Sequence, residues 1–167
     1  RRAGEQFLTS GLIEEGHQAL RTVLAVVGMK IAPTPRRALV SLLFRRAQLA
    51  IRGFRFVPRR PSEIRPDTLT RIDICWSAAL GLAMSDLIHS AHFQVLNLLL
   101  ALKAGEPFRI TRALLMEMGM CSTGGSRAQK RTARIQKRCR ELVAQVDHPY
   151  THGLLAVMES SVASLNG

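Results

Sequence analysis

The side chains with the clearest chemical potential are a group of arginines and lysines between residues 127 and 138. The candidate site residues in this group are Arg127, Lys130, Arg131, Arg134, Lys137 and Arg138. The four arginines follow one another at spacings of four, three and four, so a helix places them in one stripe flanked by the two lysines. Because a guanidinium is a planar fork of donors that matches a phosphate or a carboxylate, this basic stripe is a candidate surface for an anionic partner.

Three interpretations of the basic stripe remain open. The simplest is a solvated helix face, which is where charged residues of a surface helix normally lie. The second is a surface for an acidic protein segment, and the third is a nucleic-acid site. No aromatic residues are interleaved to stack on bases, and no DNA-reading motif accompanies the stripe. Glu141 is the only acid on the same predicted helix. We therefore favour the solvated face, then a protein partner, then nucleic acid.

Other reactive residue types lack the partners that catalysis or metal binding requires. His148 and His152 are four residues apart, and His89 and His92 are three apart, but no third ligand completes a site. Cys121 stands just before a Gly-Gly pair, where a nucleophile would need a strand-to-helix turn and a paired base. Its surroundings are helical instead. The sequence predicts no catalytic residue, no metal and no cofactor in this chain.

Composition restricts the class of protein. The 167 residues are 47% apolar, which is enough for a core, and only 5% aromatic, which favours helices over a β-sandwich. Twenty of the 24 basic residues are arginine, and we attribute this to a GC-rich genome before a binding function. Three cysteines without metal-site spacing, no leader-like segment and no apolar run of spanning length predict reduced thiols, a cytoplasmic location and no membrane insertion.

Apolar residues recur at spacings of three and four throughout the chain, which predicts an all-α fold. The predicted helical segments cover residues 12–27, 34–53, 67–83, 87–105, 106–124, 126–146 and 148–167. Their starts carry Thr-Pro, Asp, Glu-Pro, Ser or His-Pro, and several end at glycine, as is typical of helix ends. Residues 54–66 are rich in proline and arginine and predict a long connection.

Short connections predict antiparallel packing of consecutive helices. Pro107 and Pro149 begin segments roughly 42 residues apart, close to the period of helical solenoids. We predict antiparallel helix pairs stacked as a TPR-like α-solenoid, with a compact orthogonal bundle as the alternative, over a single segment 1–167 of a larger protein. Gly81 and Gly153 are predicted packing positions, since a helix glycine is otherwise unfavourable. A segment of such a stack should expose apolar ends and self-associate.

A family resemblance rests on residues 11–16 (GLIEEG), 33–39 (PTPRRAL), 71–77 (RIDICWS) and 98–107 (LLLALKAGEP). These stretches resemble the helical-repeat region of large bacterial serine/threonine protein kinases that carry an AAA-like or STAND-type ATPase module. The resemblance implies a regulatory or protein-binding role within a signalling kinase. It brings no catalytic residue to this chain, because the kinase motifs and the ATPase phosphate loop do not occur in the sequence. We expect a non-enzymatic interaction scaffold, with a nucleic-acid-binding helical domain as the alternative.

Overall fold

The computed structural model describes residues 18, 22–25, 28–29 and 34–166, and this part of the chain contains helices and no strand. The α-helices are α3 (Pro35–Arg52), α4 (Pro66–Leu82), α5 (Leu87–Ala104), α6 (Pro107–Ser122), α7 (Gln129–Val146) and α8 (Pro149–Asn166). Two short 3-10 helices are η1 (Pro61–Glu63) and η2 (Gly125–Ala128). The all-α prediction is confirmed for these residues. Most of the predicted segment 12–27 lies outside them.

Helix ends follow local sequence signals. At the start of α3, Thr34 Oγ1 accepts a hydrogen bond from the backbone N–H of Arg37 at 3.4 Å. At the start of α6, the Glu106 carboxylate accepts from the backbone N–H groups of Phe108 and Arg109 at 3.0 and 2.9 Å. Each cap satisfies N–H groups that have no partner within the helix itself. The paired Thr-Pro and Glu-Pro signals therefore predicted both starts correctly.

Two other predicted N-caps were wrong. Asp67 lies in the first turn of α4 and does not cap it, because the helix already begins at Pro66. The fixed φ of proline suits the first helical position, and the long connection therefore ends one residue earlier than predicted. Ser126 does not cap α7, since η2 intervenes and Ala128 occupies the N-cap position without a side-chain hydrogen bond.

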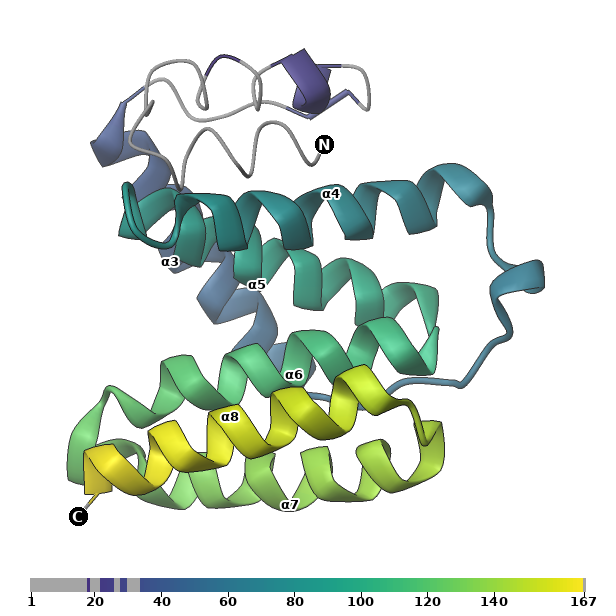
Figure 1. Cartoon of the computed structure of the whole chain (residues 1–167). Coiled ribbons are helices and arrows are strands. Elements are labelled where there is room, and N and C mark those ends of the chain that lie inside the picture. Colours follow the sequence, from purple (N-terminus) through teal and green to yellow (C-terminus); the bar gives the residue numbers. More distant parts are fainter. Residues whose placement is uncertain (1–17, 19–21, 26–27, 30–33, 167) are drawn as a thin grey trace.

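Helices α4 to α8 alternate in direction, as predicted for consecutive helices with short connections (Figure 1). α5 packs against α3, α4 and α6, and α6 packs against α5, α7 and α8. α3 is the exception, because it crosses behind α5 and does not pair with its neighbour in sequence, α4 (Figure 1). The stacking of antiparallel helices is common to a solenoid and to a bundle, so the TPR-like arrangement stays a prediction.

The core has two parts that meet at α5. The larger apolar cluster lies mainly between α5, α6, α7 and α8, also takes in residues of α3 and α4, and contains the fully buried Leu98, Leu114 and Met118. The smaller cluster joins Leu24 to α4 and to Phe93 of α5. Within the described residues, α5 is also the one helix that is long and apolar enough to cross a membrane, by length and composition alone. Because 56% of that helix is buried inside the fold, the same apolar character is accounted for by its central position.

The glycine predictions had a mixed outcome. Gly81 is buried in α4. Gly153 was wrongly predicted as a packing position, because a Cβ built there has no atom within 4 Å. The close approach is at Gly119 of α6, where a Cβ would lie 2.8 Å from Met158 Sδ of α8. Spacing within one helix does not reveal which glycine faces a neighbour.

The connection between α3 and α4 is fastened to the C-terminal end of α5 (Figure 1). The backbone N–H of Arg59 donates to the carbonyl of Gly105 at 2.9 Å. Gly105 has φ 86, a left-handed conformation that favours glycine, and any Cβ there would collide with the carbonyl oxygen of Val57. Glycine at this position therefore serves both as the helix cap and as the contact point for the connection.

Candidate interaction surfaces

α7 points its apolar stripe inward and its cationic stripe outward, as predicted. The buried residues of α7 are Thr132, Ile135, Cys139, Leu142 and Val143. Among the predicted site residues, Lys130, Arg134 and Lys137 are exposed and form no ion pair with the rest of the described chain. We call these three residues the basic patch. The side chain of Arg127 lies outside the described residues.

The remaining two predicted site residues are engaged by carboxylates. Arg131 Nη2 lies 3.1 Å from Glu117 Oε1 of α6, a carboxylate that is completely buried. Arg138 Nη1 lies 3.0 Å from Glu141 Oε2 one turn away, and its guanidinium is 5.9 Å from the ring centre of Phe56. These two arginines therefore contribute less free positive charge than the sequence indicated.

Neighbouring helices also supply acids to α7, and the spacing of residues along a single helix does not reveal these acids. Arg140 Nε contacts Glu159 Oε1 of α8 at 2.6 Å, and Gln136 donates to the same oxygen at 3.1 Å. Burial would raise the pKa of Glu159, but the hydrogen bonds from Arg140 and Gln136 outweigh burial and lower it. Glu141 is the only acid on α7 itself, but Glu117 of α6 and Glu159 of α8 also neutralise part of its charge.

α3 presents a broad apolar face to solvent, on the side opposite to its contacts with α5. Its exposed large apolar residues, with exposed fractions between 44% and 89%, are Leu39, Val40, Leu43, Phe44 and Ile51. The opposite side carries the buried Ala38 and Leu49. α3 also contains five arginines and no acidic residue. An apolar surface of this extent with a cationic border is typical of protein-interaction sites.

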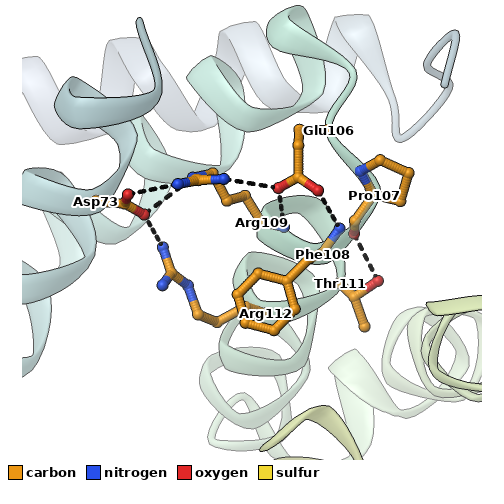
Figure 2. A network of polar contacts seen from close by, with 7 residues as sticks. All are labelled: Asp73, Glu106, Pro107, Phe108, Arg109, Thr111 and Arg112. Atoms are coloured by element: carbon orange, nitrogen blue, oxygen red, sulfur yellow. Dashed lines mark hydrogen bonds and ion pairs between the residues drawn. The ribbon is translucent and has the colours of Figure 1, made fainter. Parts of the chain in front are cut away.

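A network of charged side chains joins α4 to the first half of α6 (Figure 2). Arg109 donates to both carboxylate oxygens of Asp73, from Nε at 3.0 Å and from Nη2 at 2.7 Å. Arg109 Nη1 also reaches Glu106 Oε2 at 3.1 Å, and Arg112 Nη2 reaches Asp73 Oδ1 at 2.9 Å. The Arg112 guanidinium stacks on Trp76, 4.5 Å from the ring centre. We call Asp73, Glu106, Arg109 and Arg112 the Asp73 cluster.

The pKa values within the Asp73 cluster reflect competition between burial and pairing. Burial would raise the pKa of Asp73, but hydrogen bonds and charge from Arg109 and Arg112 hold it below its ordinary value of 3.8. Burial lowers the pKa of Arg112 despite its contact with Asp73. Burial would also lower the pKa of Arg109, yet its two carboxylate partners raise it. Every carboxylate of the cluster is paired with arginine, so the cluster acts as a structural link between helices.

A second charged network joins α3, α6 and α7 around Glu117, which is 0% exposed. Its Oε1 accepts from Arg46 Nη1 at 2.6 Å, from Arg131 Nη2 at 3.1 Å and from Cys121 Sγ at 3.4 Å. Its Oε2 is buried and has no hydrogen-bond partner in the described part of the protein. We call Glu117, Arg46, Arg131 and Cys121 the Glu117 cluster.

The cysteines are poor nucleophiles in this fold. Burial raises the pKa of Cys75 and Cys139 to about 12. Burial, and after it the charge of Glu117, raises the pKa of Cys121 to about 11. Because the thiolate is the reactive form, all three thiols are unreactive near neutral pH.

The histidines are dispersed. His89 is buried, and burial lowers the pKa of His92 on the same helix. His148 accepts a hydrogen bond from a backbone N–H at the start of α8, and His152 contacts an aspartate carboxylate at 3.1 Å. Over residues 34–166 and the few described positions before them, no group of three potential metal ligands comes together.

Two cavities lie at the end of the molecule where the α3–α4 connection passes the end of α5 and the start of α6. One, of about 470 Å³, is lined by the connection, the start of α6 and the turn between α7 and α8. The other, of about 380 Å³, is lined mainly by cationic side chains of α3, the connection and α5. The arginines of residues 54–66 were predicted only as part of a connection, and this second cavity was not predicted from the sequence.

Comparison with known proteins gives no match for this chain: no family model matches it, and no curated protein or solved structure shows significant similarity to it. The resemblance to kinase-associated helical repeats therefore stays a prediction from the sequence.

Proposed function

We propose that this chain is a protein-interaction scaffold that binds a helix of its partner on the apolar face of α3. The observation that carries the proposal is the exposure of five large apolar side chains on that one face. The most exposed of them is Ile51, with an exposed fraction of 89%. Burying a large apolar side chain stabilises a complex by about 1.5–3 kcal/mol before the costs of association. Several such residues on one helix provide enough contact for specific recognition.

The rest of the fold supports α3 as a preformed surface. Its inner side packs against α5 through Leu49, and Arg46 fastens it to the buried Glu117 of α6 at 2.6 Å. A surface that is already ordered loses little conformational freedom when a partner binds.

The partner is an amphipathic helix with acidic residues beside its apolar stripe. Arg36 and Arg37 lie next to the exposed face of α3 and form no ion pair with the described residues, and α3 itself contains no acid. Acidic residues flanking an apolar stripe would pair with these arginines while the stripes pack together.

The test uses a labelled acidic amphipathic peptide and a sequence-scrambled peptide of equal composition, with binding followed by fluorescence anisotropy. We expect the amphipathic peptide to bind, and the double variant Val40→Glu/Phe44→Glu to lose binding at least tenfold. The matched control Val157→Glu changes an exposed apolar residue of α8 and should bind like the parent chain. Equal binding of the two peptides, or no binding of either, would contradict the proposal.

Sedimentation velocity separates a second copy of the chain from a distinct partner. Salt near physiological strength screens repulsion between the arginines of two α3 helices. Reversible association that is abolished by Val40→Glu/Phe44→Glu would identify the second copy as the occupant of the face and replace the acidic-helix assignment.

A nucleic-acid-binding role is the second candidate, and the exposed basic patch favours it. Its test is binding of a labelled oligonucleotide over a salt series, with Lys130→Glu/Arg134→Glu as the variant and Arg36→Glu/Arg37→Glu as a control of equal charge. Steep salt dependence that weakens only in the α7 variant would support this role. Arg131 is left unchanged because its loss would also disturb the buried Glu117.

The wider role, as a regulatory segment of a bacterial signalling serine/threonine kinase, is a proposal supported by the resemblance alone. Kinase and ATPase motifs elsewhere in the same reading frame would support it. A complete reading frame without either set of motifs would overturn it.

A further inference from the structure

The smaller cavity gathers cations from three parts of the chain. Arg52 comes from the end of α3, Arg55 and Arg59 from the connection, and Lys103 from the last turn of α5. Together they line a space of about 380 Å³, and Leu102 and neighbouring residues of the connection complete its walls. We call this space the cationic cavity.

The positive charge of the cationic cavity is not neutralised by any acid in the described part of the chain. Arg52 donates instead to backbone carbonyls, those of Gly53 at 3.2 Å, Arg55 at 3.1 Å and Leu102 at 3.0 Å. These carbonyls hold the guanidinium in place without removing its charge. Arg55, Arg59 and Lys103 form no ion pair with the residues that the structure describes. In contrast, the arginines of the Asp73 and Glu117 clusters all contact carboxylates.

Backbone contacts hold the Arg52 guanidinium and the main chain that carries the other cations. Arg59 donates its N–H to the Gly105 carbonyl, and Gly105 has no Cβ that would push the connection away. Lys103 belongs to the last turn of the central helix α5. A group of like charges carried by an ordered main chain is an arrangement that a bound anion would stabilise.

We propose that the cationic cavity binds a small molecule carrying at least two phosphate groups. Phosphate oxygens match guanidinium forks and an ammonium group, and several negative charges are needed to neutralise four cations. The site is separate from the apolar face of α3, so the inference goes beyond the proposed scaffold function.

The first experiment is isothermal titration calorimetry of the full chain with pyrophosphate, tripolyphosphate and inorganic phosphate at low salt. We expect tripolyphosphate and pyrophosphate to bind more tightly than inorganic phosphate. Citrate serves as the carboxylate probe, and it should bind at least tenfold more weakly than pyrophosphate. Equal binding of citrate would overturn the assignment to phosphate, and no heat from any polyphosphate would overturn the site itself.

The second experiment locates the site. Arg55→Gln/Lys103→Gln removes two charges from the cavity, and both side chains are exposed, so the fold should survive. We expect pyrophosphate affinity to fall at least tenfold. The control Arg36→Gln/Arg37→Gln removes the same charge about 24 Å away along α3 and should stay within twofold of the parent chain. An equal loss in both double variants would show binding to overall positive charge and would contradict the cavity assignment.

Arg59→Gln provides an independent variant that leaves the backbone hydrogen bond to Gly105 available. Circular dichroism and thermal melting verify that each variant is folded. The acidic amphipathic peptide should not displace pyrophosphate, because α3's apolar face and the cavity use different side chains. Displacement would show that the peptide and pyrophosphate compete for one site, and it would contradict the proposal that the two sites are independent.

Discussion

The Asp73 cluster and the Glu117 cluster both place carboxylates against arginines along α6, yet they satisfy their oxygens differently. Asp73 divides its donors between both oxygens, with Arg109 bridging the two. Glu117 receives three donors on Oε1, while its buried Oε2 has no partner among the described residues. A buried oxygen without a hydrogen bond costs free energy that Oε1 must offset.

The two clusters therefore have different roles: one stabilises the folded state, and the other holds helices in position. The Asp73 cluster pairs every carboxylate and should contribute to the free energy of unfolding. The Glu117 cluster should contribute little, because the desolvation of a fully buried carboxylate opposes its ion pairs. What the Glu117 cluster does is tie α3 and α7 to α6. The position of α3, and with it the proposed binding face, is therefore set by the packing of α3 against α5 together with this weakly stabilising contact.

The largest expected effect is that of Asp73→Ala. Removing this carboxylate leaves Arg109 and Arg112 partly buried without their main partner, which should lower the free energy of unfolding by about 3 kcal/mol. Urea denaturation near neutral pH measures this change. The control Asp67→Ala, whose carboxylate is exposed beside Arg65, should change stability little. A loss below about 1 kcal/mol would break the comparison, since the Asp73 cluster would then be no more stabilising than a surface pair.

The acid dependence of stability sharpens the same comparison. The pKa of Asp73 is lower in the folded chain than its ordinary value of 3.8, so its stabilisation is present above that value and is lost as the pH falls through the folded pKa. The stability gap between the parent chain and Asp73→Ala should therefore narrow in denaturation experiments as the pH falls from about 5 to below about 3. A gap that stays constant would mean that the deleted carboxylate acted through packing and not through charge.

Glu117→Met should have a smaller effect on stability, about 1 kcal/mol or less, because the change removes an unpaired oxygen while Arg46 and Arg131 can turn toward water. Hydrogen exchange supplies the second measurement. Glu117→Met should speed exchange of α3 amides more than that of the other helices, whereas Asp73→Ala should speed exchange without singling out α3. If Glu117→Met is as destabilising as Asp73→Ala, both clusters stabilise the fold to the same degree, and the proposed difference between them is wrong.

The smallest effect concerns Cys121. Burial and then the charge of Glu117 raise the pKa of this thiol to about 11, so Glu117→Met should lower the pKa and speed alkylation by iodoacetamide severalfold at mildly alkaline pH. Mass spectrometry resolves the sites, and the buried Cys75 and Cys139 serve as internal controls. Faster alkylation of all three thiols would indicate general loosening and not a local change of charge.

Local patterns in the sequence predicted the helices well. The buried stripe of α7 was predicted because its members recur with the helical period, as with Thr132, Ile135 and Cys139. Starts marked by Thr34 and Glu106 were predicted because a cap is a contact between residues two or three apart. The misplaced start of α7 has the same origin, since a serine before a basic run resembles a cap whether or not a 3-10 turn intervenes.

Contacts between residues that are far apart in the sequence have no comparable local pattern. Glu117 lies 71 residues from Arg46 and 14 from Arg131, so the sequence gives no sign that one carboxylate serves both. The cationic cavity has the same character, because Arg52 and Lys103 converge with the connection only when α3 crosses α5. The basic stripe was predicted on the correct side of α7. Its free positive charge is lower than the sequence indicated, because Arg131 and Arg138 pair with carboxylates.

The contact between Gly105 and Val57 also affects how the sequence at this end of the molecule could change during evolution. Main-chain atoms of Val57, Arg59 and Gly105 meet at this point, so the exposed side chains of Arg55, Arg59 and Lys103 can be exchanged without changing that contact. Substitutions at positions 55, 59 and 103 would change which ligand the cationic cavity prefers without moving the backbone around it. Position 105, although it binds nothing, is the residue that tolerates no such variation.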